Sequence, residues 1–107
     1  MKRLLMIFSL LAGLIATGPI AYAQDPALHG RALLAEFCAK CHAIRSVGKS
    51  RHPSAPPFRT LGRNFDLDQF PRVLERGISA GHPDMPEIKF SIDDANAVVA
   101  YLRTIQQ

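Results

Sequence analysis

Two cysteines and a histidine stand at a fixed spacing in the first half of this 107-residue chain. Cys38 and Cys41 are separated by two residues and His42 follows directly, which gives the pattern C-x-x-C-H. Residues three and four apart on a helical turn share one face, so both thiols can reach one flat macrocycle and form thioethers with it. His42 can then lie beneath a central iron as an axial ligand. The spacing therefore predicts one covalently attached haem c.

Other uses of a C-x-x-C pair fit the rest of the chain poorly. A thioredoxin-like redox pair belongs beside a βαβ unit, and the sequence shows no such alternation of strands and helices. A structural zinc site needs four ligands, usually from two paired clusters. The chain has two cysteines in all, and its histidines show no H-x3–5-H spacing. A chance occurrence of the motif in a loop is the alternative that stays open.

The first 23 residues have the layout of a secretory signal peptide. Residues 1–3 are a basic start, residues 4–15 are apolar, and the segment Ala-Tyr-Ala at 21–23 resembles a cleavage site. We expect cleavage there, which leaves 24–107 as one small domain exported to the bacterial periplasm. The alternative is an uncleaved anchor, because the apolar stretch is nearly long enough to span a bilayer. Membrane contact is expected only in that case.

The charge of the exported part argues against one class of partner. Without Lys2 and Arg3, eleven basic residues remain against nine acidic ones, a net charge of +2 that two haem propionates would bring close to zero. Nucleic-acid binding is therefore not expected. The charge is also uneven, because six basic and no acidic residues lie between Phe37 and Phe65, whereas seven acids face three bases from Asn64 to Asp94. The basic stretch predicts docking with an acidic redox partner.

Helical signals flank the motif on both sides. Asp25 and Pro26 are a good N-cap and first residue. Apolar residues at helical spacing, Leu28, Ala32 and Ala35 and also Leu34 with Cys38, favour a helix over about 26–40. A second helix is expected from Gln69 to Arg76, and the region between them, residues 43–64, is predicted to be a loop. Ser91 and Asp94 approximate a capping box for a last helix, whose apolar stripe includes Ile92, Ala95, Val99, Leu102 and Ile105.

In this order of features the chain resembles class I c-type cytochromes. The pattern G-x3-L-x3-C at Gly30, Leu34 and Cys38 is similar to the first helix of that family, and Ala-Tyr-Leu at 100–102 is similar to its last helix. The resemblance implies a small all-α cytochrome c fold with three to four helices around one covalently attached haem. It also implies that Gly30 permits a close helix crossing, against which the aromatic Tyr101 packs.

The resemblance further assigns the surroundings of the iron. The segment from Pro56 to Leu61 is similar to P-x-L-x-x-L, in which the proline carbonyl accepts a hydrogen bond from Nδ1 of the axial histidine. Pro56 matches best, although the adjacent Pro57 stays an alternative. Met85, the one methionine left after cleavage, lies in a proline-flanked loop before the last helix and matches the second axial ligand. His82 is a rival ligand, and His29 and His52 are weaker ones.

These features predict an electron carrier rather than an enzyme. With His42 and Met85 as axial ligands, the iron would cycle between Fe(II) and Fe(III) with little room for chemistry on a substrate. We expect a monomer that meets redox partner proteins. Two alternatives stay open: a haem subunit of a larger periplasmic or membrane oxidoreductase, and a haem enzyme or gas-binding protein with an open site.

Overall fold

The fold consists of helices joined by long loops. The computed structural model describes residues 13, 18, 24–79 and 81–107, so the predicted signal peptide lies outside the described residues except for two glycines. The elements, in chain order, are α1 (Pro26–Phe37), the 3-10 helix η1 (Phe58–Arg63), α2 (Phe70–Arg76) and α3 (Ile92–Ile105). The described part contains no strand, only an isolated antiparallel bridge between Ile78 and Ile88. The predicted small all-α fold with three to four helices is confirmed.

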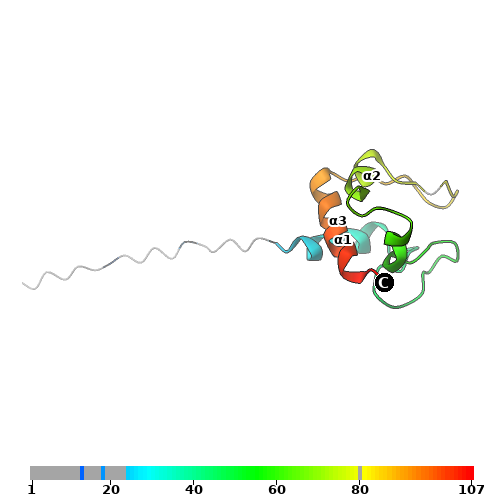
Figure 1. Ribbon diagram of the computed structural model, residues 1–107, viewed down its shortest axis with the longest axis horizontal. Coiled ribbons are helices and arrows are strands. Elements are labelled where there is room, and N and C mark those ends of the chain that lie inside the picture. Colours follow the sequence, from blue (N-terminus) through cyan, green and yellow to red (C-terminus); the bar gives the residue numbers. More distant parts are fainter. Residues whose placement is uncertain (1–12, 14–17, 19–23, 80) are drawn as a thin grey trace, which may run out of the picture.

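Helices α1 and α3 cross at the centre of the domain (Figure 1). Gly30 makes this approach possible, because a Cβ built there would lie 1.9 Å from the carbonyl oxygen of Ala97 and 2.8 Å from Cα of Val98. The atoms nearest to this glycine thus belong to the α3 backbone rather than to an aromatic side chain. Tyr101 is buried, and its hydroxyl donates a hydrogen bond to the carbonyl oxygen of Ile44 at 2.7 Å. Tyr101 therefore connects α3 to the loop after the C-x-x-C-H turn.

The buried face of α1 is one of the two apolar faces that the sequence offers. Leu28 is 60% exposed, and Ala32 and Ala35 are also exposed, whereas Gly30 and Leu34 are buried against α3. The repeat of Leu28, Ala32 and Ala35 does not mark this face, whereas Leu34 with Cys38 and the glycine of the family pattern do. The predicted helix is present, and the face it buries is the one that the resemblance assigns to the crossing, with Gly30 and Leu34.

Helix α3 forms the middle of the core. Its N-terminus is capped as predicted, since Ser91 Oγ accepts a hydrogen bond from the backbone N–H of Asp94 at 3.1 Å. Asp94 also pairs with His29 of α1, whose Nε2 lies 2.7 Å from Oδ1 of the carboxylate. The buried side chains of α3 pack with those of α1 and α2, and the buried hydrophobic residues of the core are Leu34, Phe70, Leu74, Phe90, Ala95, Val98, Val99, Tyr101, Leu102 and Ile105.

Two loops leave the helices on the same side of the molecule, at the right of the view in Figure 1. We call residues 43–57 the proximal loop and residues 79–87 the Met85 loop; Ala80 of the latter is not described. The predicted loop over 43–64 is shorter than expected because its second half forms η1. Among the described residues, no helix is both long and apolar enough to cross a membrane.

Candidate haem site

The C-x-x-C-H motif forms a tight turn directly after α1. The helix ends at Phe37, earlier than predicted, yet one more helical turn follows because the N–H groups of Cys41 and His42 both donate to the carbonyl oxygen of Cys38, at 3.2 and 2.9 Å. The N–H groups of Cys38 and Ala39 in turn share the carbonyl oxygen of Leu34. Helical spacing is thereby kept beyond the helix itself, and both thiols and the imidazole line one cavity.

The Cys38 thiol sits in an environment that favours uncharged sulfur. Burial, and to a smaller extent charge repulsion from the neighbouring Cys41, raise the pKa of the Cys38 thiol to about 11. The free thiol at this position is therefore protonated at neutral pH. A thioether sulfur carries no ionisable proton, so the surroundings of Cys38 suit a covalently attached sulfur well.

The imidazole of His42 is held on two sides. Its Nδ1 lies 2.8 Å from the carbonyl oxygen of Pro56, and its ring stacks on that of Phe58 with centroids 4.5 Å apart and planes 29° apart. A carbonyl can only accept, so Nδ1 carries the proton and Nε2 keeps a free lone pair that can bind a metal. The backbone of this segment is fixed by the N–H of Phe58, which donates to the carbonyl oxygen of Ala43 at 2.9 Å.

The structure also separates the two tandem prolines that the sequence left as alternatives. The carbonyl oxygen of Pro57 accepts hydrogen bonds from the hydroxyl and the backbone N–H of Thr60, at 3.2 and 3.4 Å, in the first turn of η1. The carbonyl oxygen of Pro56 is the one beside His42. Of the two prolines, Pro56 is therefore the one whose carbonyl contacts the imidazole, and its role beside an axial ligand stays a prediction.

Met85 reaches the same cavity from the opposite loop. Paired backbone hydrogen bonds between Ile78 and Ile88, at 2.9 and 3.1 Å, close the base of the loop, and the N–H of Met85 donates to the carbonyl oxygen of His82 at 3.0 Å. The Met85 side chain is half-buried and lines the cavity together with Cys38 and His42. His82 lines it as well, whereas His29 lies away from it, paired with Asp94.

The cavity fits a large flat apolar group. Its volume is about 500 Å³, within the range of about 300–1,000 Å³ typical of cofactor sites. All helices and both loops contribute to its walls, and its apolar lining includes Leu34, Phe37, Phe58, Leu61, Phe65, Phe70, Leu74, Ile78, Ile88, Phe90, Val98 and Leu102. Two thiols and one imidazole stand on one wall and a thioether lines the same space, which is the set of donors that covalent haem attachment and axial ligation require.

One polar group at this cavity was not found from the sequence. His52 of the proximal loop and Asp84 of the Met85 loop are both cavity-lining residues, and His52 Nε2 lies 3.2 Å from Asp84 Oδ2. From the sequence, His52 is only a weak rival to Met85 as the second axial ligand. The two residues are 32 positions apart, and no local pattern connects them.

Comparison with known proteins agrees with this site. The family model described as cytochrome C oxidase, cbb3-type, subunit III matches residues 25–102. No curated protein and no solved structure matches the chain significantly. The match confirms the predicted c-type cytochrome domain and its covalently bound haem c.

Proposed function

The chain belongs to the cytochrome c oxidase, cbb3-type, subunit III family, and we propose that it is an electron carrier with one haem c whose iron is bound by His42 and Met85. The observation that carries this proposal is the convergence of Cys38, Cys41, His42 and Met85 on a single apolar cavity. Bound there, the haem would supply one-electron exchange between Fe(II) and Fe(III).

The residues around His42 prepare it for this role. Because Nδ1–H donates to Pro56, the tautomer is fixed and Nε2 is the nitrogen offered to the iron. The stack with Phe58 restricts rotation of the ring, so little reorganisation is needed when the ligand bond forms. We therefore assign Pro56 and Phe58 to orienting this ligand.

The thioether of Met85 would complete the axial pair from the other loop. Methionine favours reduced iron and raises the reduction potential relative to a second histidine. With His42 and Met85 both bound to it, the iron would have no position left for a substrate, which supports a carrier rather than an enzyme. The largely apolar cavity walls would limit the access of water to a bound iron and so support the same assignment.

The axial assignment is tested by optical spectra and potentials of three variants. Met85→Ala and Met85→Leu should both lose the weak long-wavelength band of a methionine–iron bond, lower the reduction potential and bind carbon monoxide, since leucine keeps much of the volume but supplies no ligand. His82→Ala is the matched control from the same loop and should keep the band. A band lost in His82→Ala and kept in both Met85 variants would assign the ligand to His82.

A second candidate function is a haem subunit of a membrane oxidase, which the family match favours. The two functions differ in where the protein is found after cell fractionation. A free carrier is recovered alone from the soluble exported fraction, whereas a subunit copurifies with larger membrane proteins after mild detergent extraction. Comigration of haem staining with a large complex on a native gel would favour the subunit.

Export to the periplasm is part of the proposal and follows from residues 1–23. Cleavage after Ala23 would make Gln24 the first residue of the mature protein. Mass spectrometry of the purified holoprotein measures this directly, together with the mass of one attached haem. An intact N-terminus in a membrane fraction would replace the signal peptide with an anchor.

A further inference from the structure

His52 and Asp84 join the tips of the two loops beside the haem cavity. His52 Nε2 lies 3.2 Å from Asp84 Oδ2, and the ring of His52 also meets that of His82 edge to face, with centroids 5.4 Å apart. Neither axial ligation nor haem attachment uses this contact. It is nevertheless a direct link between the segment after His42 and the segment that carries Met85.

The hydrogen bonds determine which atom of His52 donates. The backbone N–H of Ser54 donates to His52 Nδ1 at 3.1 Å, so Nδ1 must be the acceptor nitrogen of the ring. In a neutral imidazole the proton is then on Nε2. Nε2–H therefore donates to the Asp84 carboxylate, which gives a bond to a charged acceptor, stronger than a bond between neutral groups.

The two ends of this contact differ in how firmly they are held. The backbone N–H of His52 donates to the carbonyl oxygen of Cys41 at 3.0 Å, and its own carbonyl oxygen accepts from the N–H of Ala55 at 3.1 Å. His52 is therefore fixed directly to the C-x-x-C-H turn. Its imidazole extends from a rigid part of the site toward the less supported loop.

The Met85 loop has few connections to the rest of the domain. Within its described residues, 79 and 81–87, the hydrogen bonds from Gly81 to Ser79, from Asp84 to His82 and from Met85 to His82 all stay inside the loop. The bond from His52 is the one that reaches the described part of this loop from another segment. Asp84 directly precedes Met85, so a restraint on the first limits the movement of the second.

We propose that His52 is a positioning residue for Met85: through its hydrogen bond to Asp84 it ties the Met85 loop to the haem-attachment turn and keeps the methionine sulfur at the iron. Its effect on the iron rests on the proposed ligation by Met85, whereas the loop contact itself does not. Loss of the tie makes exchange of the methionine for an external ligand easier without changing the helical core.

The same side chains could be taken for a metal site, because ligand atoms of His52, His82 and Asp84 all lie within 4.8 Å of one another. However, backbone N–H groups already donate to Nδ1 of both histidines. A metal bound at Nε2 would leave the ring proton on Nδ1, where it would face a backbone N–H instead of accepting from it. A metal bound at Nδ1 would displace that backbone N–H. The hydrogen-bonded tie is therefore the arrangement that these contacts favour.

The test is an imidazole titration of the oxidised holoprotein, untagged and in the presence of a chelator. His52→Ala and Asp84→Ala should each raise the apparent imidazole affinity by about two- to tenfold, the range expected for one lost hydrogen bond. The double variant should add little to either single one, because both remove the same bond. His52→Gln, which keeps an N–H near the position of Nε2, should restore most of the wild-type value.

His29→Ala provides the matched control, since it removes the other histidine–aspartate pair, between α1 and α3. It should lower the melting temperature and leave imidazole affinity unchanged. Hydrogen exchange at the Met85 amide gives a readout that does not depend on the iron: His52→Ala should speed this exchange, and His29→Ala should not.

The outcomes distinguish the proposed ligation by Met85 from the proposed tie between His52 and Asp84. A wild type without a methionine–iron band defeats the proposed ligation, and the amide exchange then decides the tie by itself. A wild type with that band, in which His52→Ala and Asp84→Ala change neither imidazole affinity nor Met85 exchange, overturns the tie. A wild-type imidazole affinity that rises to the variant value when the chelator is added would assign the contact to a bound metal instead and would also overturn it.

Discussion

The closest contact between helices in this domain predicts a strong effect of one added methyl group. In Gly30→Ala the new Cβ would lie 1.9 Å from the carbonyl oxygen of Ala97, 2.4 Å from its carbonyl carbon and 2.8 Å from Cα of Val98. A close carbon–oxygen contact needs about 3.3 Å. All three atoms belong to the α3 backbone, so no side-chain rotation can relieve the overlap, and the two helices must separate by about 1.4 Å.

Two opposing effects set the size of the change. Alanine is a better helix former than glycine and would stabilise α1 by about 1 kcal/mol. Overpacking costs about 1–3 kcal/mol and occasionally more, and a backbone clash on both helices belongs at the upper end or beyond. We therefore expect a net loss of about 2–3 kcal/mol in the free energy of unfolding. For a domain of this size that lowers the melting temperature by about 10–20 °C.

Circular dichroism of the oxidised holoprotein during heating measures this loss. Ala35→Gly is the matched control, because Ala35 is exposed on the same helix and its loss costs only helix propensity, about 1 kcal/mol. The direction in which Gly30→Ala shifts the melting temperature shows which of the two effects is larger. If that variant melts at or above the wild-type temperature, propensity outweighs the clash, and α1 and α3 do not cross as closely as the structure has them.

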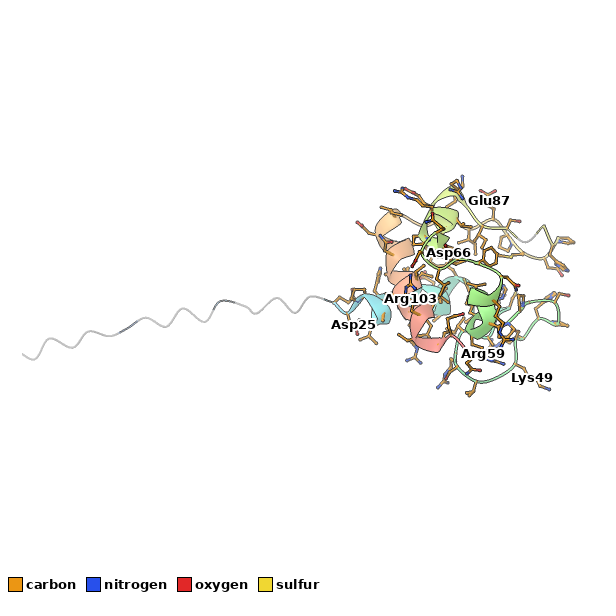
Figure 2. All side chains as sticks on the ribbon, in the orientation of Figure 1. Asp25, Lys49, Arg59, Asp66, Glu87 and Arg103 are labelled. Atoms are coloured by element: carbon orange, nitrogen blue, oxygen red, sulfur yellow. The ribbon has the colours of Figure 1, made fainter. Side chains whose placement is uncertain are left out.

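Two further predictions concern the haem and the docking surface. Replacing both Cys38 and Cys41 with alanine should prevent haem attachment and leave a poorly folded, protease-sensitive chain; native helicity with a sharp melt would contradict this. Figure 2 shows Lys49 and Arg59 at the opposite end of the domain from Glu87, and electron transfer to an acidic partner should slow as salt rises toward about 0.1 M. Stopped-flow rates should fall with Lys49→Glu and Arg51→Glu together, and rates insensitive to both salt and these charges would show docking elsewhere.

The parts of the site that the sequence predicted are those with short-range causes. The thiols and His42 lie within five residues, and one helical turn brings them to one face. The position of Pro56 follows from a loop of fixed length after His42, in which a proline leaves its carbonyl free. Such features depend on local geometry, so a sequence carries them almost completely.

The features that the sequence did not predict depend on packing between distant segments. Periodicity alone leaves two apolar faces on α1, and the packing of the α3 backbone against Gly30 decides which of them is buried. The tie between His52 and Asp84 exists only because the cavity brings two loop tips together. His52 lies in the basic stretch of the sequence and Asp84 in the acidic one, and only the fold places them in contact.

Buried residues are unevenly distributed in this domain, so the helices and the two loops differ in stability. Seven of the eleven buried hydrophobic residues lie on α3, whereas no described residue of the proximal loop or the Met85 loop is buried. Segments with few buried contacts open at a lower free energy than the core. Under the proposed ligation, release of the Met85 sulfur from the iron would require only that its loop opens, while α1, α2 and α3 stay packed. The affinity of the iron for an external ligand should then follow the contacts of the Met85 loop and not the stability of the helices, so that Gly30→Ala and His52→Ala act on different properties of the same protein.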